Sequence, residues 1–89
     1  ENAQGYNYRG LAYFQAGNLQ EAMNNFNRAI QLDPRYSEAY GYRAIAKYLS
    51  KDLRGALKDC DKAIRLNPKD KKILNIRTKI MHELKAAGN

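Results

Sequence analysis

The chain has 89 residues, 44% of them hydrophobic, and its 16 lysines and arginines outnumber its 9 acidic residues to give a net charge of +7. This length suffices for one small domain with a thin core, and the composition is typical of a globular chain, which excludes disorder throughout. No apolar run approaches the roughly 18 residues that a membrane span requires, and residues 1–4 do not resemble the start of a secretory signal.

Basic charge is concentrated in the later part of the chain. Residues 1–34 carry two basic and three acidic side chains, a net charge of −1, whereas residues 35–89 carry fourteen basic and six acidic ones, a net charge of +8. Such a one-sided field attracts acidic proteins, nucleic acid or an anionic membrane without choosing among them. The single cysteine, Cys60, excludes an internal disulfide and favours a reduced, cytoplasmic compartment, with a periplasmic or secreted domain without disulfides as the alternative.

Helices are expected throughout, because no stretch of more than a few residues alternates with period two. In chain order they cover about residues 2–16, 18–32, 37–50, 52–66 and 70–87. Asn2 is placed to cap the first helix, and Gly17 supplies the left-handed residue that ends it. Asn18 and Glu21 resemble a capping box that opens the second helix, which ends before Pro34. The predicted fold class is all-α.

The next two helices follow the same plan with one exception. Asp52 is placed to cap the fourth helix, and Pro68 ends it. Lys51 stands where the preceding hairpin has Gly17, so this turn is expected to be less favourable or differently shaped.

The chain repeats itself with a period of 34 residues. When residues 3–34 are aligned with residues 37–68, ten of the 32 pairs are identical. The identical positions in the first unit are Tyr6, Tyr8, Arg9, Ala12, Leu19, Ala22, Ala29, Ile30, Leu32 and Pro34. These identities cluster at helical spacing, which indicates a repeated packing unit.

This period and its motif residues resemble the tetratricopeptide repeat family. In the first unit the motif positions are Tyr6, Arg9, Gly10, Tyr13, Ala22, Phe26, Ala29 and Pro34. In the second they are Tyr40, Arg43, Ala44, Lys47, Ala56, Cys60, Ala63 and Pro68. Arginine replaces the family's large aliphatic residue as Arg9, Arg43 and Arg77. The resemblance implies one domain over residues 1–89, a right-handed α-solenoid with repeats at 3–36 and 37–70 and a capping or half-repeat helix at 71–89.

The resemblance also implies that the first helix of each hairpin lines a concave groove. Helical periodicity then predicts that a partner peptide contacts Asn7, Tyr8, Leu11, Tyr42, Ile45, Leu49, Lys72, Asn75, Ile76 and Lys79, with Gln4, Gln15, Glu38 and Gly41 on the same helix faces. Tyr8 and Tyr42 are expected side by side, because they are equivalent in the repeat. Alternatively, some of these apolar residues pack against neighbouring helices, or a second copy or further repeats cover them.

One subfamily grips the C-terminal carboxylate of chaperone tails with Lys and Asn on the first helix, Asn on the third, and Lys and Arg on the fifth. The matching positions in this sequence hold Asn7, Leu11, Tyr42, Lys72 and Ile76. Only Lys72 fits, so the sequence predicts that chaperone tails are not gripped by that arrangement.

A basic stripe follows the fourth helix and is expected on the convex side. Its members are Lys51, Arg54, Lys58, Lys62 and Arg65. It offers charge for phosphates, or it is a solvated face diluted by Asp59 and Asp61. Because no aromatic stacking platform accompanies it, nucleic acid and membrane binding are disfavoured.

Catalysis is not expected. His82 has no cysteine nearby in sequence, and Cys60 occupies a position that the repeat buries. Neither a glycine-rich phosphate loop nor a metal-ligand set is present, so no cofactor and no metal are predicted. The predicted function is a scaffold that binds a peptide or helix of another protein, for which acidic character would match the basic charge. Self-association within a longer repeat array, and anion or nucleic-acid binding through the basic face, are the alternatives.

Overall fold

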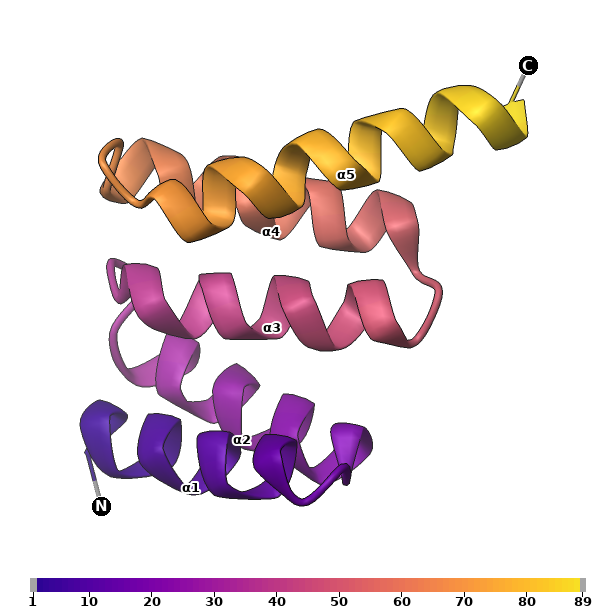
Figure 1. The fold of residues 1–89 in the computed structure, drawn as a ribbon. Coiled ribbons are helices and arrows are strands. Elements are labelled where there is room, and N and C mark those ends of the chain that lie inside the picture. Colours follow the sequence, from indigo (N-terminus) through magenta and orange to yellow (C-terminus); the bar gives the residue numbers. More distant parts are fainter. Residues whose placement is uncertain (1, 89) are drawn as a thin grey trace.

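The computed structural model describes residues 2–88, and these residues form an array of α-helices. The helices are α1 (Ala3–Gln15), α2 (Leu19–Leu32), α3 (Ser37–Leu49), α4 (Leu53–Leu66) and α5 (Lys71–Gly88). Each helix packs mainly on its neighbours in sequence, and α3 also touches both α1 and α5. Figure 1 shows α1, α3 and α5 following one another from the N-terminal to the C-terminal end, with α2 and α4 behind them. The predicted all-α solenoid is confirmed.

Side-chain caps fix where the helices begin. The Oδ1 atoms of Asn2, Asn18 and Asp52 each accept a hydrogen bond from the backbone N–H three residues later. Each bond satisfies a donor that the first turn of a helix leaves unpaired. Asp70 does the same for α5, since its Oδ1 lies 3.3 Å from the Ile73 nitrogen. These capping residues were all expected at helix starts, and the helix boundaries agree with the sequence to within one or two residues. No helix within residues 2–88 is both long and apolar enough to cross a membrane.

The turn at Lys51 keeps the shape of the turn at Gly17. Both residues have a positive φ, +82° for Gly17 and +72° for Lys51. The residue after each turn donates its backbone N–H to a carbonyl five residues earlier, from Asn18 to Tyr13 at 2.9 Å and from Asp52 to Lys47 at 2.8 Å. Of the two alternatives expected for this turn, the change of shape is therefore absent. The expected energetic cost remains, because a side chain with a Cβ is disfavoured in the left-handed region.

Close approach of paired helices depends on compensating side-chain sizes. A Cβ placed on Gly10 would lie only 2.7 Å from Cε1 of Phe26. The Phe26 ring of α2 therefore packs directly against α1 at Gly10, where no side chain is in the way. At the equivalent pair in the next hairpin, Ala44 and Cys60 are both fully buried. One pair thus combines a ring with a glycine and the other combines two small residues, so the spacing of the helices is preserved.

We predict that Lys51→Gly raises the free energy of unfolding by about 1 kcal/mol, because glycine adopts a positive φ without steric cost. Urea denaturation followed by circular dichroism measures the change. Ser50→Gly is the matched control, since Ser50 has a φ of −86° and gains nothing from glycine. A Lys51→Gly protein that is no more stable than the Ser50→Gly protein would show that the turn carries no strain.

Candidate peptide groove and basic cleft

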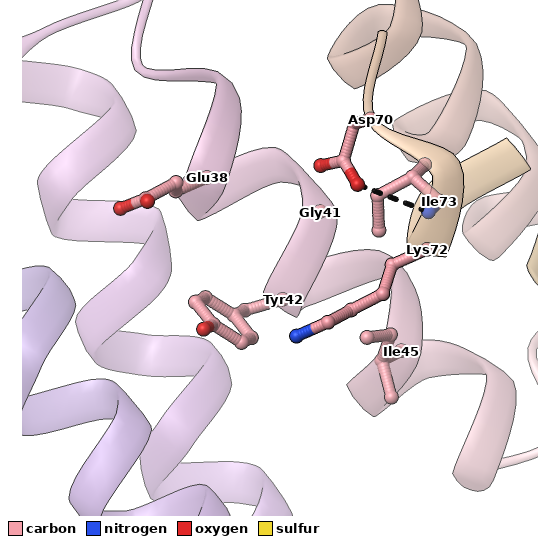
Figure 2. Close-up of a pocket in the computed structure, with 7 residues that line it drawn as sticks. All are labelled: Glu38, Gly41, Tyr42, Ile45, Asp70, Lys72 and Ile73. Carbon is pink, nitrogen blue, oxygen red and sulfur yellow. Dashed lines mark hydrogen bonds between the residues drawn. The ribbon is translucent and has the colours of Figure 1, made fainter.

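A small pocket lies between α3 and α5. Its volume is about 120 Å³, and it is lined by Glu38, Gly41, Tyr42, Ile45, Asp70, Lys72 and Ile73. Figure 2 shows the Lys72 amine reaching between the side chains of Tyr42 and Ile45, with Glu38 and Asp70 toward the other end. The pocket therefore combines apolar walls with one amine and two carboxylates.

Gly41 and Ile73 set the depth of this pocket. A Cβ on Gly41 would lie 3.0 Å from Cδ1 of Ile73, so the isoleucine fills the space that a larger residue in α3 would occupy. Ile73 is buried, and its backbone nitrogen is fixed by the Asp70 cap. Because α5 begins at this cap, Lys72 is placed on its first turn at the mouth of the pocket. Asp70 and Ile73 were not among the predicted groove residues, although the sequence predicted that a helix begins at about residue 70.

The two equivalent tyrosines occupy different surroundings. The Tyr42 ring stacks on Phe26, with centroids 5.8 Å apart, and contacts Phe14 at a tilted angle. Tyr8 is 58% exposed, and its hydroxyl accepts a hydrogen bond from Gln4 Nε2. Tyr42 is thus partly packed against neighbouring helices while one edge of it lines the pocket.

Asn7 does not lie on an open groove surface. Its side chain is only 1% exposed, which corrects the expectation that a peptide would contact it. The amide forms a hydrogen bond with the hydroxyl of Tyr36, in the connection between α2 and α3, and its Oδ1 has no hydrogen-bond partner among the described residues. Burial and the Glu38 carboxylate raise the pKa of Tyr36, and the bond to Asn7 partly offsets them. Asn7 lies at the edge of the helix face that periodicity selects, so the pattern could not decide whether its side chain faces the groove or is buried.

The other predicted groove residues divide by exposure. Leu11, Ile45 and Ile76 are half-buried, whereas Leu49, Asn75 and Lys79 are exposed. Of all the predicted set, the pocket brings together Tyr42, Ile45 and Lys72.

A second cleft lies between α3 and α4. Its volume is about 340 Å³, and it is lined by Tyr40, Arg43, Lys47, Lys58, Asp59, Lys62 and Arg65. The predicted basic face therefore contributes Lys58, Lys62 and Arg65 to this cleft, while Lys51 and Arg54 do not line it.

Asp59 organises the inner part of this cleft, although the sequence suggested only that it dilutes the charge. It is 3% exposed and accepts two hydrogen bonds of 2.7 Å from the Nε and Nη2 atoms of Arg43. Lys47 Nζ lies 3.1 Å from the same carboxylate. Arg43 also donates from Nη1 to Asn27 Oδ1 of α2 at 2.8 Å. The arginine that departs from the family pattern thus joins α2, α3 and α4.

Cys60 has no setting for nucleophilic chemistry. It is fully buried, and burial together with the Asp61 and Asp59 carboxylates raises the pKa of its thiol to about 11. His82 is exposed on α5. Nowhere in residues 2–88 do three His, Cys, Asp or Glu side chains gather in a way that would hold a metal ion.

Comparison with known proteins identifies the family. Residues 3–36 match the family model described as Tetratricopeptide repeat. The first TPR of Spaghetti (RPAP3), solved bound to HSP90 peptide SRMEEVD, is 28% identical with a TM-score of 0.92, over 94% of this chain and 67% of that one. The second TPR domain of human RPAP3, solved in complex with HSP70 peptide SGPTIEEVD, is 30% identical with a TM-score of 0.85, over 90% of this chain and 67% of that one. The MamA protein shares the fold at 21% identity and a TM-score of 0.77, over 94% of this chain and 51% of that one. No curated protein matches the sequence.

The chain belongs to the tetratricopeptide repeat family. It spans about two thirds of the length of the RPAP3 domains it resembles. Domains of this family are typically non-catalytic, and the chain is accordingly a protein–protein interaction scaffold.

We predict that Cys60 reacts with Ellman's reagent at pH 8 at least about a hundredfold more slowly in the native protein than in protein unfolded in urea. The raised pKa leaves less of the nucleophilic thiolate at that pH, and burial slows the reaction further. Absorbance at 412 nm follows the reaction. Equal rates in the native and unfolded protein would contradict the buried position of this thiol.

Proposed function

We propose that the chain holds a short peptide or helix of a partner protein in a groove along α1, α3 and α5. An apolar side chain of the partner enters the pocket between Tyr42 and Ile73, and Lys72 contacts a carboxylate or carbonyl oxygen of the same segment. The observation that carries this proposal is the pocket itself, whose apolar walls meet the exposed Lys72 amine beside the carboxylates of Glu38 and Asp70.

The size of the pocket favours a side chain over a small-molecule ligand. At about 120 Å³ it is smaller than the roughly 300–1,000 Å³ of a typical small-molecule site. A peptide needs only a few such anchoring points, because most of the binding energy of an interface comes from a few residues. Tyr8 supplies a further exposed aromatic surface on α1.

The partner's terminal carboxylate is not the main determinant in this proposal. The RPAP3 domains were solved with acidic chaperone peptides, and this supports an acidic segment as the partner here too. At the five positions of the carboxylate-gripping arrangement, however, this chain offers only Lys72. Asn7 is buried, and Ile76 supplies no hydrogen-bond donor from its side chain. One lysine contacts one carboxylate, so recognition must rest mainly on the apolar pocket.

The test is a peptide array that includes SRMEEVD and SGPTIEEVD, each as the free acid and as the C-terminal amide. We predict that Tyr8→Ala/Lys72→Gln lowers the affinity for captured peptides by about tenfold or more, since it removes an aromatic contact and a charged one. Both side chains are exposed, so the fold is retained. Fluorescence anisotropy measures each dissociation constant.

Tyr13→Ala/Lys85→Gln is the matched control, because it removes the same two residue types at exposed positions outside the pocket. Equal binding by the two variants would refute the groove as the site. A peptide that loses its affinity on amidation would refute the minor role assigned to the terminal carboxylate.

A further inference from the structure

The basic cleft and the peptide pocket lie on opposite sides of α3. Successive residues of a helix are rotated by about 100°. At this spacing Glu38, Gly41, Tyr42 and Ile45, which line the pocket, share one face of α3, and Tyr40, Arg43 and Lys47, which line the cleft, share the opposite face. A ligand in the cleft is therefore separated from a peptide in the groove by the whole helix.

Three cations in the cleft remain available to a ligand. The Asp59 carboxylate engages Arg43 and Lys47. In the part of the chain that the structure describes, Lys58, Lys62 and Arg65 form no ion pair. With five basic side chains and one carboxylate, the cleft carries a net charge of +4. It therefore concentrates the charge excess of the chain at one place.

The aromatic residue of the cleft offers no stacking surface. The Cζ atom of Arg43 lies 5.6 Å from the centroid of the Tyr40 ring, and the Nζ atom of Lys62 lies 5.9 Å from the same centroid. The ring is almost wholly buried, and its hydroxyl donates a hydrogen bond to the Pro34 carbonyl oxygen. A nucleic-acid base needs an open ring face, and this cleft does not provide one.

The positive surface is also short. Lys58, Lys62 and Arg65 span about 10 Å along α4, at about 1.5 Å per residue. The equivalent positions in α2 are Asn24, Arg28 and Gln31, where Arg28 donates to Gln31 and lies over the Tyr6 ring. The positive charge at these positions thus falls from three side chains on α4 to one on α2. A nucleic acid gains affinity from many phosphate contacts along its length, whereas about three or four residues of an extended peptide match this span.

We propose that the cleft between α3 and α4 is a second binding site, which takes a short run of glutamate or aspartate residues from a partner protein. Lys58, Lys62 and Arg65 contact the carboxylates, and the Arg43–Asp59–Lys47 cluster holds α3 and α4 at the spacing that forms the cleft. Binding here is independent of the peptide groove, so one partner can use both sites or two partners can bind together.

The test uses a fluorescein-labelled peptide, acetylated and amidated, that contains four consecutive glutamates, with a four-glutamine peptide as its neutral counterpart. At physiological salt the glutamate peptide is expected to bind the wild-type protein more tightly than the glutamine peptide does. Lys58→Gln/Arg65→Gln is expected to weaken binding of the glutamate peptide about tenfold, from the loss of two charge contacts. Lys71→Gln/Lys85→Gln removes the same net charge from exposed positions outside the cleft and is expected to leave the affinity within about twofold.

Three outcomes would overturn the proposal. Equal losses of affinity in Lys58→Gln/Arg65→Gln and in Lys71→Gln/Lys85→Gln would show that only the overall positive charge of the protein attracts the peptide. Loss of binding in Tyr8→Ala/Lys72→Gln would place the glutamate peptide in the groove, whereas retained binding supports the cleft whether or not the groove proposal holds. A uridine oligonucleotide of equal charge that binds more tightly than the peptide, and that is weakened by Lys58→Gln/Arg65→Gln, would assign the cleft to nucleic acid.

Discussion

The guanidinium of Arg43 is the contact on which the arrangement of the central helices depends. It reaches Asn27 of α2 with one nitrogen and Asp59 of α4 with two others, so three helices meet at one planar group. Arginine suits this position because its donors are fixed in a fork that matches a carboxylate. Arg77 makes a corresponding contact from α5 to Asp61 at 2.6 Å, although both of these side chains are more exposed. Arg43 and Arg77 therefore each link their helix to the preceding hairpin, at the position where the family pattern has an aliphatic residue.

This link explains how one helix serves two surfaces. Because Arg43 and Lys47 draw α4 onto one side of α3, the other side is left to face α5 and form the pocket. Tyr48 adds a second connection between α3 and α5, through the hydrogen bond of its hydroxyl to Glu83. Asp59 offsets one of the two inner positive charges, so most of the charge that remains in the cleft lies on α4. The +4 of the cleft is thus divided between a structural cluster with a net charge of +1 and three cations on α4.

Much of the fold followed from local sequence signals. Caps such as Asn18 and Asp52 act through their own backbone neighbours, so a single sequence suffices to predict them. The ion pair of Arg43 and Asp59 was not predicted, because the two residues lie sixteen positions apart and only the packing of α3 on α4 brings them together. Repeat equivalence was also incomplete as a guide to the site. It treats Tyr8 and Tyr42 alike, yet Tyr42 has the Phe26 ring beside it while Tyr8, in the first helix, is open.

Chemical-shift mapping of the ¹⁵N-labelled protein with an uncharged peptide that the array captures tests the central claim most directly, because it locates the bound segment without a mutation. The account predicts that the backbone amides of Gly41, Tyr42, Ile45, Lys72 and Ile73 shift together as the peptide is added, while those of Lys58 and Arg65 stay in place. Shifts confined to α2 and α4 would contradict it, since they would place the peptide on the side of the molecule away from the pocket.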